Sequence, residues 1–471
     1  MAKGRGIETS GIDAQPALVY CSHELNLTGR ARFSANKFAD QGAAQPPTTI
    51  MAMLSYRLGL RGAWVVLLQT IVALPAAPGD WPQWQGPARD GVSSETGLLK
   101  EWPAAGPKLV WKATGLGQAY GSVILQGDRI YVAGDKEGAS FLNALKRADG
   151  KPVWTAKLGK GGAPGWGGFV GPRSTPATDG ELVVAATQWG ELACFESASG
   201  KELWRKDYTR DFGGSRPEWG FAESPLIDAD RVVVTPGGSK GAVVALNKKT
   251  GAVLWQSEQF TDRAHYSSVI VEEIGGIRQY IQLTAGSVAG IAAADGKLLW
   301  RATRKGETAV IPTPIYSDSM VYVTSGYGIG CNLFRITETG GKFNVEQVYA
   351  NKVMGNHHGG VVKVGNFIYG YSDSKGWTCQ DFKTGEARWQ EKEKLKKGSV
   401  VFADGNLYLR EEDKPGTVAL VEATPEGYLE HGRFNPPDRS PEQSWSHPVV
   451  AGGRLYLRDM DVLLCYDVKA P

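Results

Sequence analysis

Short apolar runs alternate with polar turns along most of the chain, and one such pattern recurs. Five segments align without gaps, and each has a glycine four residues before a tryptophan: ALKRADGKPVW (144–154), CFESASGKELW (194–204), ALNKKTGAVLW (245–255), GIAAADGKLLW (290–300) and CQDFKTGEARW (379–389). The pattern predicts a β-hairpin: an apolar strand, a polar turn whose glycine takes a positive φ, and a second strand whose indole packs on a neighbour.

A second apolar pair precedes each hairpin, so each repeat is predicted to contain four strands. Repeats begin near Gly121, Thr175, Ser224, Ser267, Thr313, Gly359, Ser399 and His447, and the fifth and seventh lack the final tryptophan. Their length of roughly 40 to 50 residues is that of propeller blades. We therefore expect an all-β, eight-bladed β-propeller of four-stranded antiparallel blades, or seven blades if one weak repeat is an insertion.

The last repeat stops at LLCYDVKAP without a fourth strand. Residues 107–115 (PKLVWKATG), which include Trp111, are expected to supply that strand and to close the ring. Closure removes the open sheet edges that invite aggregation. We assign residues 107–471 to the propeller and residues 78–106 to an N-terminal extension.

The first 77 residues differ from the rest. The apolar stretch GAWVVLLQTIVALPAA (62–77) follows two arginines and ends in small residues, which predicts a signal peptide over residues 51–77, or a membrane anchor if it is not cleaved. Residues 1–50 are interpreted as a non-native or disordered leader, with Met51 or Met53 as the true start. The protein is therefore expected to be exported, to the periplasm or outside the cell, and to meet a membrane only through this segment.

Charge narrows the choice of partner. Residues 1–77 hold seven of the 52 basic and four of the 49 acidic residues, so residues 78–471 carry equal numbers of each. A neutral body without a basic run argues against nucleic acid as the partner, because that affinity depends on neutralising phosphates.

The repeat resembles the tryptophan-docking repeat of pyrroloquinoline quinone (PQQ) β-propellers over about residues 107–468. DWPQWQGPARDGVSSETGLLKEWP (80–103) likewise resembles the start of exported PQQ-like repeat proteins. The family contains quinoprotein alcohol and sugar dehydrogenases and also the non-enzymatic propeller subunit of the outer-membrane barrel assembly machinery. The resemblance implies the fold and leaves the chemistry open.

Neither named function carries over residue by residue. Quinoproteins of the methanol-oxidising type resemble one another in a vicinal cysteine pair, a calcium ion and an aspartate base, but this chain has no Cys-Cys. The assembly subunit is usually a lipoprotein, and LPAAPGD (74–80) lacks the cysteine of a lipobox. We favour a scaffold that binds a small molecule or protein at its channel face, with no catalytic residue assigned. The alternative is a PQQ- and Ca²⁺-dependent alcohol or sugar dehydrogenase.

Cysteines and most tryptophans are interpreted as packing residues. Cys194, Cys379 and Cys465 occupy the repeat column that elsewhere holds Ala or Gly, so no disulfide is expected among them. The indoles assigned to blade packing are Trp111, Trp154, Trp204, Trp255, Trp300 and Trp389. Trp166, Trp189 and Trp219 lie outside this column, where an aromatic ring can stack on a flat ligand or close a loop.

Candidate binding residues lie at the blade entrances, just before the first strand of each repeat. They are Arg173, Glu223, His265, Tyr266, Asn356, His357, His358, Trp445 and His447, with Trp377 added as a further aromatic. If the fold is correct, the four histidines should gather near the mouth of the channel. NHHGG (356–360) marks the sixth entrance, where the glycines let the backbone approach the axis. His357 and His358 are expected on opposite faces of a strand, so no metal site is predicted.

Overall fold

The computed structural model describes residues 49–57, 64–72 and 79–471. The chain divides into two units, Met1–Pro75 and Ala76–Pro471. In the first, β1 (Thr49–Arg57) pairs antiparallel with β2 (Trp64–Val72). The rest of the expected leader and signal peptide lies outside the described residues, so those assignments remain predictions. Within the described ranges, no helix has both the length and the apolar character needed to cross a bilayer.

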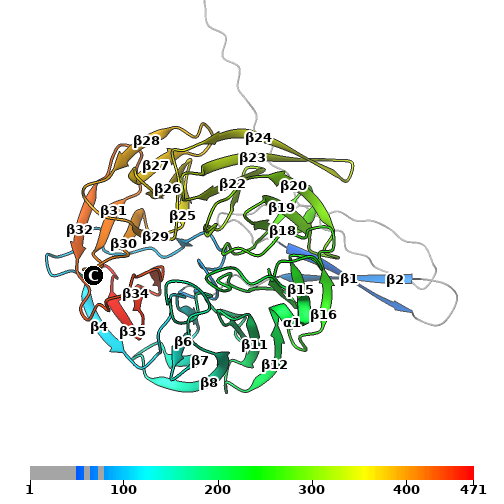
Figure 1. Cartoon of the computed structure of the whole chain (residues 1–471), viewed down its shortest axis with the longest axis horizontal. Helices are drawn as coiled ribbons and strands as arrows, with labels where there is room; N and C mark the ends of the chain where they lie inside the picture. The colour runs from blue at the N-terminus through cyan, green and yellow to red at the C-terminus, as the bar shows by residue number, and fades with distance from the viewer. Residues whose placement is uncertain (1–48, 58–63, 73–78) are drawn as a thin grey trace, which may run out of the picture. The chain divides into compact units, whose positions relative to one another are not determined.

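The second unit is an eight-bladed β-propeller in which four-stranded antiparallel sheets surround a common axis (Figure 1). The first four blades are β5–β8 (Ile124–Gln126, Arg129–Lys136, Ala139–Lys146, Pro152–Lys160), β9–β12 (Ala177–Thr178, Leu182–Ala186, Glu191–Glu196, Glu202–Asp207), β13–β16 (Leu226–Asp228, Arg231–Val234, Val244–Asn247, Val253–Gln256) and β17–β20 (Ile270–Ile274, Ile277–Leu283, Ser287–Ala292, Leu298–Thr303). A single short helix, α1 (Tyr208–Phe212), follows the second blade in the described part of the chain.

The remaining blades complete the ring. They are β21–β24 (Ile315–Ser317, Met320–Ser325, Gly330–Thr339, Lys342–Asn351), β25–β28 (Val361–Val364, Phe367–Ser372, Gly376–Asp381, Ala387–Glu391), β29–β32 (Gly398–Ala403, Asn406–Glu411, Val418–Glu422, Glu430–Phe434), and β33–β35 (Val449–Ala451, Arg454–Asp459, Val462–Asp467) with β4 (Lys108–Ala113). The expected blade starts are confirmed, and the seven-blade alternative is excluded.

Ring closure follows the prediction. β4 pairs antiparallel with β35, and Trp111 stands opposite Cys465. This register matches those of the other complete repeats, where Trp154 faces Ala144 and Trp204 faces Cys194. The small-residue column therefore exists because each indole needs a small partner across the outer strand pair. Cys194, Cys379 and Cys465 are free, and so is Cys331 in the fifth blade.

The repeat glycine explains how neighbouring blades dock. Gly200 has φ +72°, and a Cβ at this position would lie 2.6 Å from Cε3 of Trp154 in the preceding blade. The Trp154 indole Nε1 donates to the Ser197 carbonyl oxygen at 3.0 Å in the same turn. Gly251 and Trp204 repeat the arrangement one blade further on. Only glycine combines this backbone conformation with contact against a ring face.

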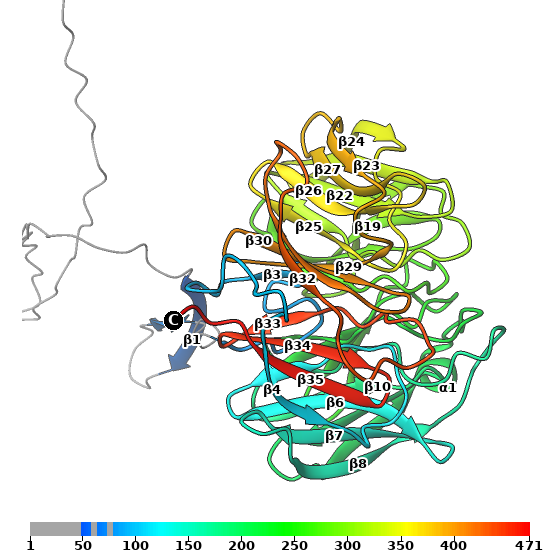
Figure 2. The same ribbon diagram turned by 90° about the vertical axis from the view of Figure 1, so that its left-hand side faces the viewer.

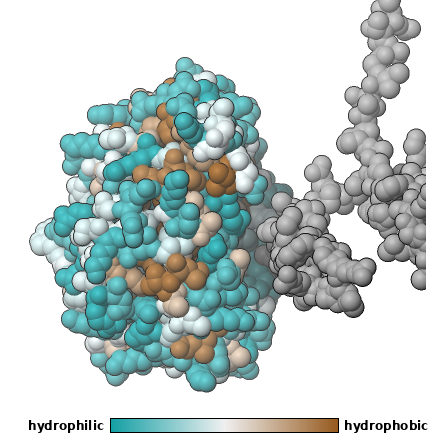
Figure 3. Space-filling model, turned by 90° about the vertical axis from the view of Figure 1, so that its right-hand side faces the viewer, coloured by the Kyte–Doolittle hydropathy of each residue, from teal (hydrophilic) through white to brown (hydrophobic). Residues whose placement is uncertain are grey.

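The core consists of apolar clusters between adjacent blades. One cluster joins the first and second blades and includes Tyr131, Val183 and Phe195. Figure 3 shows the outer rim as a largely hydrophilic surface broken by small apolar patches. The exposed apolar side chains of the outer strands include Leu203, Val253 and Leu254. Apolar side chains are therefore buried mainly between adjacent blades.

The N-terminal extension enters the ring and then reaches the outer strand β32 of the seventh blade, where the Trp102 backbone N–H donates to the His431 carbonyl oxygen at 2.9 Å. Its strand β3 (Val92–Ser93) adds to the seventh blade as a fifth strand, parallel to the innermost strand β29 (Figure 2). Trp81 forms a bridge with Leu125 of the first blade. Arg89 is buried and donates to the carbonyl oxygens of Ser224 (2.8 Å) and Pro225 (3.0 Å) at the third blade.

Candidate functional site

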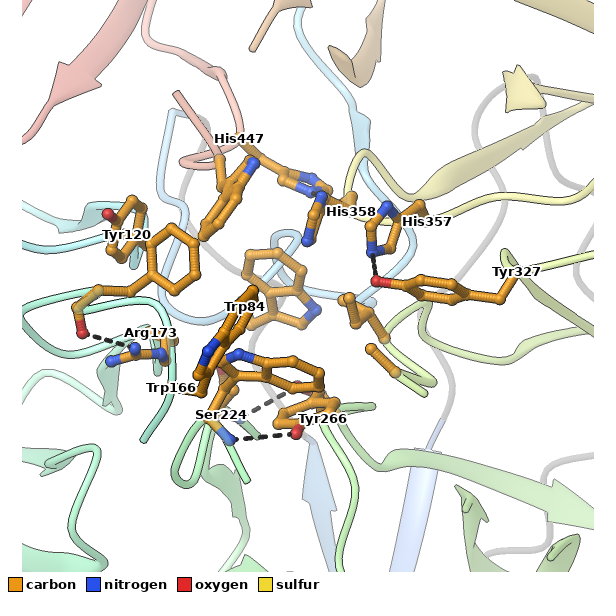
Figure 4. Close-up of a pocket in the computed structure, with 17 residues that line it drawn as sticks. Trp84, Tyr120, Trp166, Arg173, Ser224, Tyr266, Tyr327, His357, His358 and His447 are labelled. Atoms are coloured by element: carbon orange, nitrogen blue, oxygen red, sulfur yellow. Dashed lines mark hydrogen bonds between the residues drawn. The ribbon is translucent and has the colours of Figure 1, made fainter. Parts of the chain in front are cut away.

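A pocket of about 330 Å³ opens on one face of the propeller (Figure 4). Most of its residues belong to loops that lead from the outer strand of one blade to the innermost strand of the next. The lining consists of Trp84, Tyr120, Trp166, Phe169, Arg173, Trp219, Ala222, Ser224, Tyr266, Ser268, Ala309, Ile311, Tyr327, His357, His358, Trp445 and His447. Because every blade is entered from the same face, these loops meet at one end of the channel.

The NHHGG segment shows how a loop is held near the axis. Asn356 is buried, and its side-chain amide donates to the carbonyl oxygens of Gly360 (2.9 Å) and Tyr371 (3.0 Å). A Cβ at Gly359 would lie 1.8 Å from the Gly398 carbonyl oxygen of the next blade. The expectation that glycine permits a close approach is therefore confirmed, and Asn356 fixes the loop without entering the pocket.

His357 and His358 both line the pocket, and their rings stack with centroids 3.6 Å apart. The prediction that they face opposite directions is wrong. Its premise fails because residues 354–360 form a loop, where side chains do not alternate as they do in a strand. The stack continues from His358 to Trp445, at a centroid distance of 4.4 Å, and from Trp445 to Tyr120, at 4.7 Å.

The imidazoles of this stack are neutral at physiological pH. Burial, with smaller effects from His358 and Lys397, lowers the pKa of His357 to about 2. Burial likewise lowers the pKa of His358 to about 3 and that of His447 to about 4. The Lys397 ammonium lies 2.6 Å from His357 Nδ1, which must accept, so Nε2 carries the proton and donates to the Tyr327 hydroxyl oxygen at 2.7 Å.

The floor and the facing wall are also aromatic. Trp84, from the extension, packs 4.6 Å from the His447 ring, and its Nε1 donates to the Thr313 hydroxyl at 2.9 Å. Trp219 and Tyr266 lie together on another side, with centroids 6.1 Å apart. Trp166 is 75% exposed at the rim. Apart from Trp166, these rings are held by packing against their neighbours, and Trp84 also by its hydrogen bond.

The structure brings six of the ten predicted residues into one pocket: Arg173, Tyr266, His357, His358, Trp445 and His447. Three of the four entrance histidines thus gather at the channel mouth as expected. His265 does not line the pocket. Its Nδ1 accepts from the Val310 backbone N–H at 3.0 Å, and its ring packs against Tyr266.

Glu223 and Trp377 also lie outside the pocket. Glu223 is buried, and burial raises its pKa to about 8 against the opposing effects of the Thr235 backbone N–H and the charge of Arg89. Trp377 is 1% exposed inside the sixth blade, where its Nε1 donates to the Lys396 carbonyl oxygen at 3.1 Å. Both residues were predicted to bind a ligand because the amino-acid sequence alone does not show which side chains are buried.

Four aromatic lining residues escaped the sequence analysis: Trp84, Tyr120, Phe169 and Tyr327. Trp84 lies in the extension, which aligns with no repeat, and Tyr327 lies in the loop between β22 and β23 instead of at a blade entrance. Tyr120 and Phe169 could have been found as aromatics beside the entrances near Gly121 and Arg173. Trp166 and Trp219, which were noted as loop aromatics, do reach the pocket.

Comparison with known proteins gives a family and a fold. A family model described as outer membrane protein assembly factor BamB matches residues 138–391, more than half of the chain. The chain is 27% identical to the BamB of Xanthomonas campestris pv. campestris over 206 residues, which is 44% of this chain and 46% of that protein. It is 24% identical to the BamB of Shewanella oneidensis over 275 residues, 55% of this chain and 65% of that protein. The matches thus span about half to two thirds of these relatives.

A solved structure supports the fold at low identity. The quinohemoprotein alcohol dehydrogenase of Comamonas testosteroni superimposes with a TM-score of 0.59 and 12% identity, covering 83% of this chain and 81% of that one. At this identity the likeness concerns the architecture alone.

Proposed function

The chain belongs to the PQQ-like β-propeller family whose model is described as outer membrane protein assembly factor BamB, and from this premise we propose that it is a binding protein that holds a ligand in the aromatic pocket of its channel face. One observation carries the proposal: eight aromatic side chains from seven segments of the chain converge on that pocket, namely Trp84, Tyr120, Trp166, Phe169, Trp219, Tyr266, Tyr327 and Trp445. Concave, largely apolar sites with a few placed polar groups are the usual form of a small-molecule site.

These rings belong to none of the apolar clusters between the blades. The repeat tryptophans hold the blades together at the periphery, and the clusters between blades supply the core. A ring left uncovered at the axis gains stability when a flat ligand covers its face, because apolar area leaves water and stacking adds to it. The pocket is thus suited to a planar ligand.

The residues present do not fit PQQ with Ca²⁺. Calcium takes six to eight oxygen ligands, usually including carboxylates. In the part of the chain that the structure describes, no Asp or Glu lines the pocket, and no group of three or more His, Cys, Asp or Glu is placed to hold a metal ion. The chain also has no vicinal cysteine pair. We therefore derive no oxidation step for this site.

A protein partner at the same face is a second candidate. The relatives are named outer membrane protein assembly factors, and two pocket aromatics stand exposed at the mouth, Trp166 at 75% and Tyr327 at 43%. Aromatic residues that remain exposed at a rim suit a contact with another surface. Because these relatives are named outer membrane protein assembly factors, we also propose that the protein works after export, in the periplasm or outside the cell.

Tryptophan fluorescence and calorimetry test the binding proposal. The purified chain should bind flat ring compounds and quench the pocket tryptophans, and Trp445→Ala should weaken binding about tenfold through loss of one stacking surface. Trp189→Ala is the matched control, because Trp189 lies outside the pocket between the side chains of Lys160 and Arg216. Absence of binding by any ring compound, or equal effects of the two substitutions, would refute the proposal.

A further inference from the structure

We infer that the ligand of the proposed binding site is a flat ring that carries a single carboxylate, and that Arg173 receives this carboxylate. The inference rests on the proposed function and adds the chemical class of the ligand. Among the pocket residues that the structure describes, Arg173 has the only charged side chain, since the imidazoles are neutral and no carboxylate lines the pocket.

The Arg173 guanidinium has free donors. Nη1 donates to the Gly171 carbonyl oxygen at 2.6 Å. Nη2 donates to the Phe169 carbonyl oxygen at 2.7 Å, which is the bond drawn at Arg173 in Figure 4. A guanidinium has five N–H groups, so donors remain for a further acceptor after these two bonds. Its carbon also lies 5.8 Å from the centroid of the Tyr120 ring. Two backbone bonds and a ring thus hold the group in place while leaving part of its edge for a ligand.

Arg173 has no carboxylate in direct contact among the described residues. The salt bridges of the described residues do not include it, although Asp135 is near enough to favour its charged form. Burial lowers its pKa to about 10, so the group stays ionised at neutral pH. A partly desolvated cation that no carboxylate contacts directly is only partly compensated, and a ligand carboxylate would add a direct partner with charge-assisted hydrogen bonds.

The opposite wall limits the ligand to one anionic group. Lys397 stands behind His357, where its ammonium lies 3.4 Å from Asp373 and 3.9 Å from Glu412, so its charge is already balanced. Sugars are a poorer match, because the amide of Asn356 is turned to backbone carbonyls and the lining offers only hydroxyls and imidazoles in addition to Arg173. The geometry therefore favours an aryl monocarboxylate over a tricarboxylate, a metal complex or a sugar.

Two probes of equal shape test the inference on the full chain without added metal: 2-naphthoate, which is ionised at pH 7, and neutral 2-naphthamide. The measured quantity is the ratio of their dissociation constants, from tryptophan quenching and calorimetry. The native protein should prefer the carboxylate by about 10- to 100-fold, the size of one charge-assisted pair. Arg173→Gln should bring the ratio to about one, whereas Arg173→Lys should retain a preference.

The ratio separates recognition from loop support, since loosening the loop would weaken both probes alike. Lys160→Gln is the control, a basic residue that stacks on Trp189 outside the pocket, and should leave the ratio unchanged. Equal binding of both probes to the native protein, a ratio unaffected by Arg173→Gln, or tighter binding of maltose would overturn the inference while leaving a binding pocket in place. Binding of neither probe nor of any other ring compound would instead refute the proposed function.

Discussion

The outer hairpins and the entrance loops of this propeller contrast in what their aromatic residues do. At the periphery, indoles such as Trp154 and Trp204 donate to a carbonyl of the next blade and cover a glycine there. At the axis, Trp445 stacks on His358, Trp84 packs at a tilt against His447, and both line a pocket. The contrast shows that one residue type fixes the fold where it repeats and forms a site where it does not.

The largest expected effect is a loss of stability when a peripheral indole is removed. Trp204→Ala removes a buried indole from between two blades and should lower the free energy of unfolding by about 3 to 5 kcal/mol, as for other buried aromatics. Urea denaturation measures the change. Trp166→Ala, at the exposed rim, should change it by about 0.5 kcal/mol or less. Equal losses from both substitutions would show that peripheral docking is not what stabilises the ring.

A smaller loss of stability is expected when Trp154 is kept and the glycine that its indole covers is replaced. Gly200→Ala combines a positive φ with a Cβ only 2.6 Å from the Trp154 ring, and should be destabilising by about 2 kcal/mol. Gly276→Ala is a matched control, since Gly276 also has φ +72° but has no atom within 4 Å of the added Cβ. That variant should lose about 1 kcal/mol from the backbone alone. Thermal or urea unfolding of the pair isolates the contact with the indole.

The pH dependence of the free energy of unfolding tests the burial of the histidines near the axis. The pKa of His447 falls from 6.5 to about 4 through burial, so between these values the unfolded chain binds the proton and the folded chain does not. Stability due to His447 is therefore complete above pH 6.5 and declines as the pH falls toward 4, by at most about 1.4 kcal/mol per pH unit.

His447→Gln should flatten this decline, as measured by urea unfolding at pH 7, 6 and 5. Lys160→Gln, outside the pocket, should keep the native slope. An unchanged slope in His447→Gln would mean that the histidine titrates in the folded protein as it does in the unfolded chain.

The two regions also differ in how far the sequence determined them. The blades could be predicted because each hairpin is local and its Gly-x-x-x-Trp spacing recurs, so even the closing strand around Trp111 was identified. The pocket could be located because Arg173, His357 and His447 depart from a repeated column. Trp84 could not be found, since the extension has no repeat to compare with. Glu223 and Trp377 could not be dismissed, because their burial depends on contacts with other loops and strands.

The N-terminal extension places side chains inside the propeller that the repeats do not supply. Trp84 lies at the bottom of the pocket, and Arg89, which is 2% exposed, lies further along the same segment with its guanidinium bonded to the third blade. The extension therefore provides a floor to the pocket within the channel of the propeller. A ligand of this pocket would therefore enter from the face on which the pocket opens.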